Sequence, residues 1–162
     1  MAVGSASWSF TEDDFAAITQ ALQRFLDDAN ARCALLVDRS GQLVATVGEQ
    51  PRFDSTAFAT LTAADFSAND QLAKLIGERD FNSLFHQGEK ESMYLADVAR
   101  RLILVVLFDS RTTLGLVRLK MKQTVEELTK LFEQVFGRPP QDKGGAPGLL
   151  AGADDEIDKL FQ

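Results

Sequence analysis

The chain has 162 residues, of which 45% are hydrophobic and 25% charged, and its formal net charge is −7. This length fits one domain plus a tail, since single domains commonly run to about 100–150 residues. An acidic chain without a cluster of Lys or Arg lacks the basic surface that phosphate backbones require, which argues against a nucleic-acid partner.

Cysteine usage and apolar runs predict the compartment. Cys33 is the single cysteine, so no disulfide can form within the chain and a reducing environment is expected. Residues 1–10 lack the positive charge and apolar run of a secretory signal. The longest apolar run, Leu102–Phe108, is far shorter than the roughly 20 residues that cross a bilayer. These features predict a cytoplasmic protein without membrane insertion.

The first elements follow an N-terminal extension at residues 1–10. Thr11 and Asp14 form a carboxylate variant of the capping box, which predicts that a helix begins there. Apolar residues then recur at three-to-four spacing and form one core-facing stripe: Phe15, Ile18, Leu22, Phe25, Leu26 and Ala29. An apolar strand at Cys33–Asp38, a turn at 39–41 and a returning strand at 43–47 predict a hairpin.

A second helix is predicted over residues 55–76, with Asp54 as its cap. One side is expected to face the core and carries Leu61, Ala64, Ala68, Leu72 and Leu75. The opposite side is also apolar and carries Ala59, Ala63, Phe66 and Ala73. A helix that is apolar on two sides is covered on two sides, so the second side predicts contact with a second copy. The alternative is that alanine, a good helix former, is simply tolerated at the surface.

Three strands and a helix follow. The strands are predicted at 81–86, Ser92–Val98 and Leu102–Phe108, and the last should lie centrally because it is unbroken Leu, Ile, Val and Phe. Helical spacing from Leu114 to Val135 predicts a third long helix. The element order is therefore α-β-β-α-β-β-β-α, an α+β domain at residues 11–136.

The C-terminal part changes character. Residues 137–152 are rich in Gly and Pro and predict a flexible linker. Residues 153–162 predict a short amphipathic helix, in which Ile157, Leu160 and Phe161 form a small apolar face. Helices this short are marginal alone in water, so a docking peptide is one interpretation. A frayed, solubilising tail is the other.

No motif predicts catalysis, a metal or a cofactor. His86 has no neighbouring His or Cys, Cys33 lies within an apolar strand, and no phosphate-binding loop is present. Arg111 is the best-placed candidate for an arginine finger toward a GTPase. A structural role near the start of the third helix is favoured for it, because no other part of a phosphate site accompanies it. The residues thus predict a binding module without catalytic residues.

Four segments carry a resemblance to the roadblock/LC7 family: residues 34–43, 71–78, 85–89 and 104–118, with the tail at 154–161 in addition. The resemblance implies a profilin-like fold, in which helices flank a five-stranded antiparallel sheet. It also implies a homodimer built around the second helix and the third strand. With the small residues above, the expected dimer interface comprises Ala59, Ala63, Phe66, Ala73, Phe81 and Leu84.

The segments and the tail are most similar to family members that activate a bacterial Ras-like small GTPase of the MglA type in cell polarity and gliding motility. By that resemblance, the GTPase-binding residues are Thr60, Ala63, Ser67, Gln71 and Lys74, with Ala16 as an addition. Activation would position the GTPase's own Arg and Gln, without a donated arginine. The tail would dock elsewhere on the GTPase and influence nucleotide exchange. Such proteins can accumulate at a cell pole.

One stretch departs from that pattern. Relatives are rich in Ala and Gly in the middle of the second helix, whereas this chain has Asp65, Phe66, Asp70 and Gln71. Bulk at a close helix contact can cost about 1–3 kcal/mol. The alternative function is therefore a scaffold that pairs with another roadblock or polarity protein and leaves GTP hydrolysis unchanged.

Overall fold

The structure, a computed structural model, describes residues 10–137. This part of the chain contains three helices and five strands in the predicted order. Their bounds are α1 Glu12–Ala29, β1 Cys33–Asp38, β2 Leu43–Gly48, α2 Ser55–Leu75, β3 Ser83–Gln87, β4 Ser92–Val98, β5 Leu102–Phe108 and α3 Leu114–Phe136.

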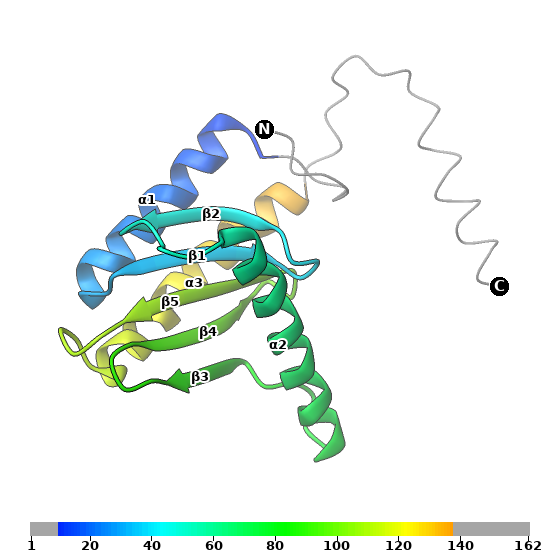
Figure 1. The fold of residues 1–162 in the computed structure, drawn as a ribbon. Helices are drawn as coiled ribbons and strands as arrows, with labels where there is room; N and C mark the ends of the chain where they lie inside the picture. The colour runs from blue at the N-terminus through cyan, green and yellow to red at the C-terminus, as the bar shows by residue number, and fades with distance from the viewer. Residues whose placement is uncertain (1–9, 138–162) are drawn as a thin grey trace.

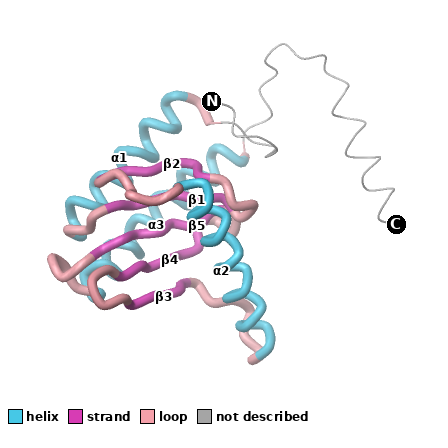
Figure 2. The backbone as a smooth tube through the Cα atoms, viewed as in Figure 1, coloured by secondary structure: helices cyan, strands magenta, loops and turns pink. Residues whose placement is uncertain are grey.

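The strands form one antiparallel sheet in the order β2-β1-β5-β4-β3, so β5 is central, as predicted. Helices α1 and α3 pack together on one face, and α2 alone crosses the other (Figures 1 and 2). β2 and β3 are the edge strands. The fold thus leaves the outward side of α2 and the edge of β3 uncovered within the described part of the chain.

Alternation along the strands divides the core in two, because successive side chains of a strand point to opposite faces. On β1, Ala34 and Leu36 face α1 and α3, whereas Leu35 and Val37 face α2. β5 alternates in the same way and is buried along almost its whole length. Covering of both faces explains why these two strands are apolar, apart from Asp38 at the end of β1.

The helix caps are as predicted. The Thr11 hydroxyl accepts a hydrogen bond from the Asp14 amide at 3.1 Å, and the Asp14 carboxylate accepts one from the Thr11 amide at 2.9 Å. The Asp54 carboxylate accepts from the Thr56 and Ala57 amides. These bonds satisfy amide groups that have no partner within the helix and so fix where α1 and α2 begin.

The prediction of which side of α2 faces the core is wrong. Leu61, Leu72 and Leu75 are 69%, 58% and 81% exposed, whereas Phe66 is fully buried. Ala59 and Ala73 are also fully buried. The physical reason is that Phe66 is the large side chain that fills the second core above the sheet, so the side carrying it turns inward.

This orientation corrects most of the expected dimer interface. Ala59, Phe66 and Ala73 are enclosed by their own chain and present no surface to a second copy. Ala63 is 8% exposed, at the border of the buried side. Leu84 is half-buried against the second core, and Phe81 lies in the loop before β3, because the strand begins at Ser83 rather than at 81.

Candidate functional site

The outward part of α2 has two sides of different chemistry. At 3.6 residues per turn, Leu61, Ala68, Leu72, Leu75 and Ile76 lie along one side, here called the leucine stripe. About a third of a turn away lies the polar stripe, which comprises Thr60, Ala63, Ser67, Gln71 and Lys74. The polar stripe contains five of the six residues predicted to bind a GTPase, so the structure brings these five together.

The β1–β2 turn approaches the polar stripe closely because the residues at the contact are small. Gly41 in that turn has φ +96°, and a Cβ added there would lie 3.2 Å from the Thr60 Cα and 3.8 Å from the Ala63 Cβ. A side chain at position 41 would therefore be strained in its backbone and crowded against the helix. The turn packs closely on α2, which explains why Ala63 is almost buried.

A groove of about 350 Å³ opens beside the polar stripe. Its walls come from α2, the loop after α2 and the β4–β5 turn, and the polar-stripe residues in its lining are Ala63, Ser67 and Lys74. Arg79 and Arg100 contribute from the loop and the turn. The groove extends the predicted surface toward residues that the sequence did not single out.

Arg39 links the two walls of this groove, α2 and β4. Its guanidinium ion-pairs with Asp70 on α2 at 2.7 Å and with Asp97 on β4, and it lies 4.7 Å from the centre of the Phe66 ring. Burial lowers the pKa of Arg39, but its hydrogen bonds to Asp97 and Asp70 outweigh burial and raise it, so it stays charged. The sequence placed Arg39 only in a turn, and no local pattern reveals partners 31 and 58 positions away.

The bulky residues of the middle of α2 are mostly engaged within the chain. Phe66 is buried, Asp70 binds Arg39, and the Asp65 carboxylate lies 2.6 Å from Nε2 of His86 on β3. Of the four residues that differ from the Ala- and Gly-rich pattern of relatives, only Gln71 is exposed and lacks a side-chain contact of this kind within residues 10–137. The bulk is therefore directed into the fold and against the sheet edge, rather than out of the polar stripe.

The remaining predicted site residues lie elsewhere. Ala16 is exposed on α1, in the layer on the opposite face of the sheet from α2. The predicted docking helix, with Ile157, Leu160 and Phe161, lies outside the described residues, as does the linker beyond Gly137.

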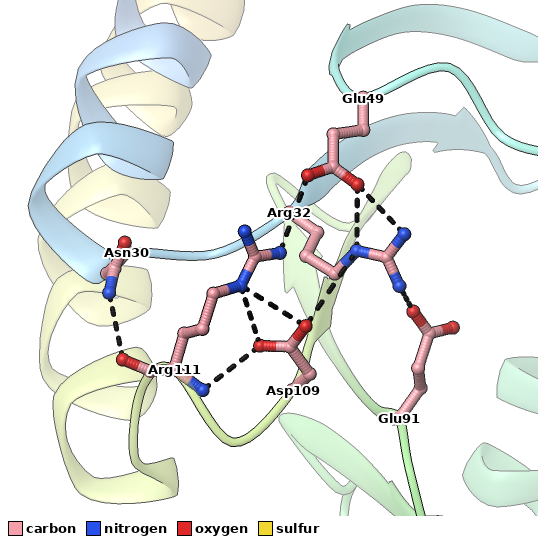
Figure 3. Close-up of polar contacts among 6 residues, drawn as sticks. All are labelled: Asn30, Arg32, Glu49, Glu91, Asp109 and Arg111. Atoms are coloured by element: carbon pink, nitrogen blue, oxygen red, sulfur yellow. Dashed lines mark hydrogen bonds and ion pairs between the residues drawn. The ribbon is translucent and has the colours of Figure 1, made fainter.

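Arg111 belongs to a charged network at the other end of the sheet (Figure 3). Its side chain binds Asp109 at 3.0 Å and Glu49 at 3.4 Å, and its carbonyl oxygen accepts a hydrogen bond from the Asn30 side chain at 2.8 Å. Arg32 joins the same network through Glu49 at 2.8 Å and through Glu91. These contacts tie the loop that carries Arg111 to the end of α1 and to the end of β2.

The network also sets the charge states of its members. Hydrogen bonds from Arg32, and then from Arg111, lower the pKa of the Glu49 carboxyl. Hydrogen bonds from the Arg111 side chain and amide lower the pKa of Asp109. Opposite charges and donated hydrogen bonds favour the ionised carboxylates, so the network stays ionised at neutral pH.

Groups for chemistry are sparse in residues 10–137. No set of three or more His, Cys, Asp or Glu side chains is arranged to hold a metal ion within these residues. Burial raises the pKa of the Cys33 thiol, which disfavours the reactive thiolate. No helix in the same range is long and apolar enough to cross a membrane.

Two helices on one face of a five-stranded antiparallel sheet and one helix on the other form the roadblock and profilin-like fold. Residues 17–108 match the model of the Roadblock/LC7 domain. The chain therefore belongs to the Roadblock/LC7 family, as its sequence indicated.

Solved structures support this assignment. Myxococcus xanthus MglB is 48% identical, with a TM-score of 0.72 and coverage of 74% of this chain and 98% of that chain. The gliding protein MglB from Thermus thermophilus is 31% identical, with a TM-score of 0.75 and coverage of 81% and 99%. Profilin IA of Acanthamoeba castellanii, at 14% identity and a TM-score of 0.53 over 69% of this chain and 96% of that chain, shares the fold alone.

Proposed function

We propose that this protein is a homodimeric regulator of a bacterial Ras-like GTPase of the MglA type and that it binds this GTPase through the polar stripe of α2. The observation that carries the proposal is the exposed polar stripe in a chain that is 48% identical to Myxococcus xanthus MglB. A rigid helix with small and polar side chains offers a surface that another protein can approach closely. Bacterial cell polarity and gliding motility are the processes in which such a regulator would act.

Acceleration of GTP hydrolysis would come from positioning rather than from a donated group. Phosphoryl transfer depends on positioning and electrostatic stabilisation, so a regulator can act by moving the GTPase's own Arg and Gln into place. Arg111, the candidate for a donated arginine, is bound to Asp109 and Glu49 here. That engagement favours a mechanism in which this chain supplies a surface and not a catalytic residue.

The homodimer would use the leucine stripe together with the edge of β3. Leu61, Leu72 and Leu75 are large apolar side chains that are exposed in the single chain. Monomeric proteins rarely leave such a contiguous patch in water. β3 presents an unpaired strand edge, and such edges readily pair with a second chain. The proposed dimer interface therefore keeps α2 and β3 but replaces the buried alanines and Phe66 by the leucines.

The proposal also covers the C-terminal tail, which lies outside the described residues, and the place of the protein in the cell. The tail at 153–162 would bind the GTPase at a second place and change its nucleotide exchange. A protein of this kind would be cytoplasmic and would accumulate at a cell pole, where it could also meet other roadblock or polarity proteins.

The test is GTP turnover by the purified MglA-type GTPase of the same organism, alone and with excess protein. The wild type should accelerate hydrolysis. Ser67→Arg, which places a bulky charge in the middle of the polar stripe, should abolish acceleration and binding while leaving the dimer intact. Gln123→Arg on exposed α3, which makes a similar change on the opposite face of the sheet, is the matched control and should behave as the wild type.

A scaffold that pairs with another roadblock protein is the second candidate function. Exposed Gln71 is the one observation that favours it, because this side chain adds bulk to the polar stripe. Binding of the GTPase without a change in turnover would support the scaffold. Unchanged binding by Ser67→Arg would instead remove the polar stripe as the binding site.

A further inference from the structure

Three cations gather around the groove beside the polar stripe. Lys74 projects from α2, Arg79 from the loop that follows it, and Arg100 from the β4–β5 turn. All three are exposed, and none forms an ion pair with any residue between 10 and 137. They are thus available to pair with acidic groups of another molecule.

The acids of the groove do not neutralise these cations. Asp70 and Asp97 are both occupied by Arg39, which they hold at the base of the groove. In total the lining carries four cations, Arg39, Lys74, Arg79 and Arg100, and three acids, Asp70, Asp80 and Asp97. The groove therefore has a formal charge of +1 and room, about 350 Å³, for an anionic group to enter.

The turn that carries Arg100 closes the β4–β5 hairpin, and the Arg101 amide donates a hydrogen bond to the Val98 carbonyl oxygen at 3.2 Å. Ala99 and Arg100 have φ values of 55° and 60°, in the left-handed region that favours glycine or asparagine. The Asp97 carboxylate supports the turn by accepting a hydrogen bond from the Arg100 amide at 3.1 Å. Positive φ at both central residues is typical of the type I′ turn that joins antiparallel strands, so the hairpin accounts for this geometry. The turn places the Arg100 side chain at the groove.

We propose that this groove receives carboxylate side chains of the GTPase and that Lys74, Arg79 and Arg100 pair with them. The inference rests on the proposed function, because the groove is continuous with the polar stripe through Ala63, Ser67 and Lys74. Complementary charge beside a small-residue contact speeds association and excludes partners with basic surfaces. Arg79 and Arg100 thereby determine specificity, while the polar stripe provides close approach.

The experiment measures binding of the full-length protein to the MglA-type GTPase by titration calorimetry at low and high salt. Arg79→Glu/Arg100→Glu should bind at least about tenfold more weakly at low salt and should lose most of the salt dependence of the wild type. Arg118→Glu/Lys122→Glu, which makes the same charge change on exposed residues of α3, is the control and should bind as the wild type.

A further variant separates the Arg100 side chain from the shape of the turn. Arg100→Gly keeps the positive φ without strain, so its resistance to urea should equal or exceed that of the wild type. Its affinity for the GTPase should nevertheless fall about threefold to tenfold, since a charge is lost.

The outcomes distinguish this inference from the proposed function. Wild-type affinity and salt dependence in Arg79→Glu/Arg100→Glu would overturn the role of the groove and leave the GTPase partner standing. Equal losses in the α3 control would overturn it too, because net charge alone would then explain the effect. Failure of the wild type to bind the GTPase would overturn both.

Discussion

Nε2 of His86 on β3 lies 2.6 Å from a carboxylate oxygen of Asp65 on α2. Asp65 lies one turn after Leu61 and seven residues before Leu72, on the side of the helix that carries the leucine stripe. The contact therefore joins the free edge of the sheet to the exposed leucines. The two surfaces proposed for the dimer are thereby adjacent, and this pair lies between them.

Leu72→Asp should convert the dimer to a monomer. The side chain is 58% exposed in the single chain, so its own fold should tolerate the charge. In an apolar dimer interface the same carboxylate would be buried without a partner, which costs several kcal/mol. Sedimentation velocity at micromolar concentration measures the result.

The matched control is Leu119→Asp on α3. Leu119 is 54% exposed and lies on the other face of the sheet, so this variant should stay dimeric. A dimer that survives Leu72→Asp, or that Leu119→Asp dissociates, would contradict the leucine stripe as the interface.

Asp65→Asn should lower the free energy of unfolding of the monomer by no more than about 1 kcal/mol, because solvent weakens a polar contact between exposed side chains. The Asp65 and His86 side chains are 38% and 45% exposed in the single chain. Urea unfolding of Asp65→Asn in the monomeric Leu72→Asp background measures this term. A loss of several kcal/mol in that background would mean that the pair is shielded from water within one chain.

Phe66→Ala should destabilise the fold by about 3–5 kcal/mol, the usual cost of removing a fully buried aromatic side chain. It also removes the ring on which the Arg39 guanidinium rests. With both variants measured in the monomeric Leu72→Asp background, Leu75→Ala on the same helix, at an 81% exposed position, should change the free energy of unfolding by less than about 0.5 kcal/mol. Equal effects in chemical unfolding would contradict the orientation of α2.

The helices and strands of this fold could be predicted from the sequence because helix caps and apolar spacing are local patterns. Thr11 and Asp54 cap the first two helices as predicted, and β1, β4 and β5 have their predicted bounds. The side of α2 that faces the core could not be predicted in this way. Both sides are apolar with the same period, and only the space above the sheet decides that Phe66 turns inward and Leu72 outward.

The candidate site likewise has one part that the sequence predicted and one part that only the structure shows. The polar stripe followed from helical spacing and the family resemblance, since all its residues lie on one helix. The groove beside it depends on Arg39, Asp70 and Asp97, which three separate elements bring together. Nothing in the local sequence of Arg100 marks it as a neighbour of α2, so this part of the surface required the structure.

The charged network predicts how stability depends on pH. Arg32 and Arg111 hold the pKa values of Glu49 and Asp109 below their ordinary values of 4.5 and 3.8. A lowered carboxyl pKa stabilises the folded state at pH values above the unfolded pKa. That stabilisation is lost as the pH falls through the folded-state value, because both states then bind the proton. The resistance of the protein to urea should therefore decline below about pH 4.5.

Glu49→Gln tests this assignment, since it removes one of the two carboxylates whose pKa the arginines lower. The urea midpoint of the variant should be below that of the wild type at pH 7. The difference should shrink as the pH falls below 4.5, because protonation of Glu49 in the wild type removes the same negative charge. Glu126→Gln on exposed α3, a residue for which the structure gives no ion pair within residues 10–137, should follow the wild type at every pH. A difference between Glu49→Gln and the wild type that stays constant across this range would show that Glu49 stabilises the fold through packing and not through its charge.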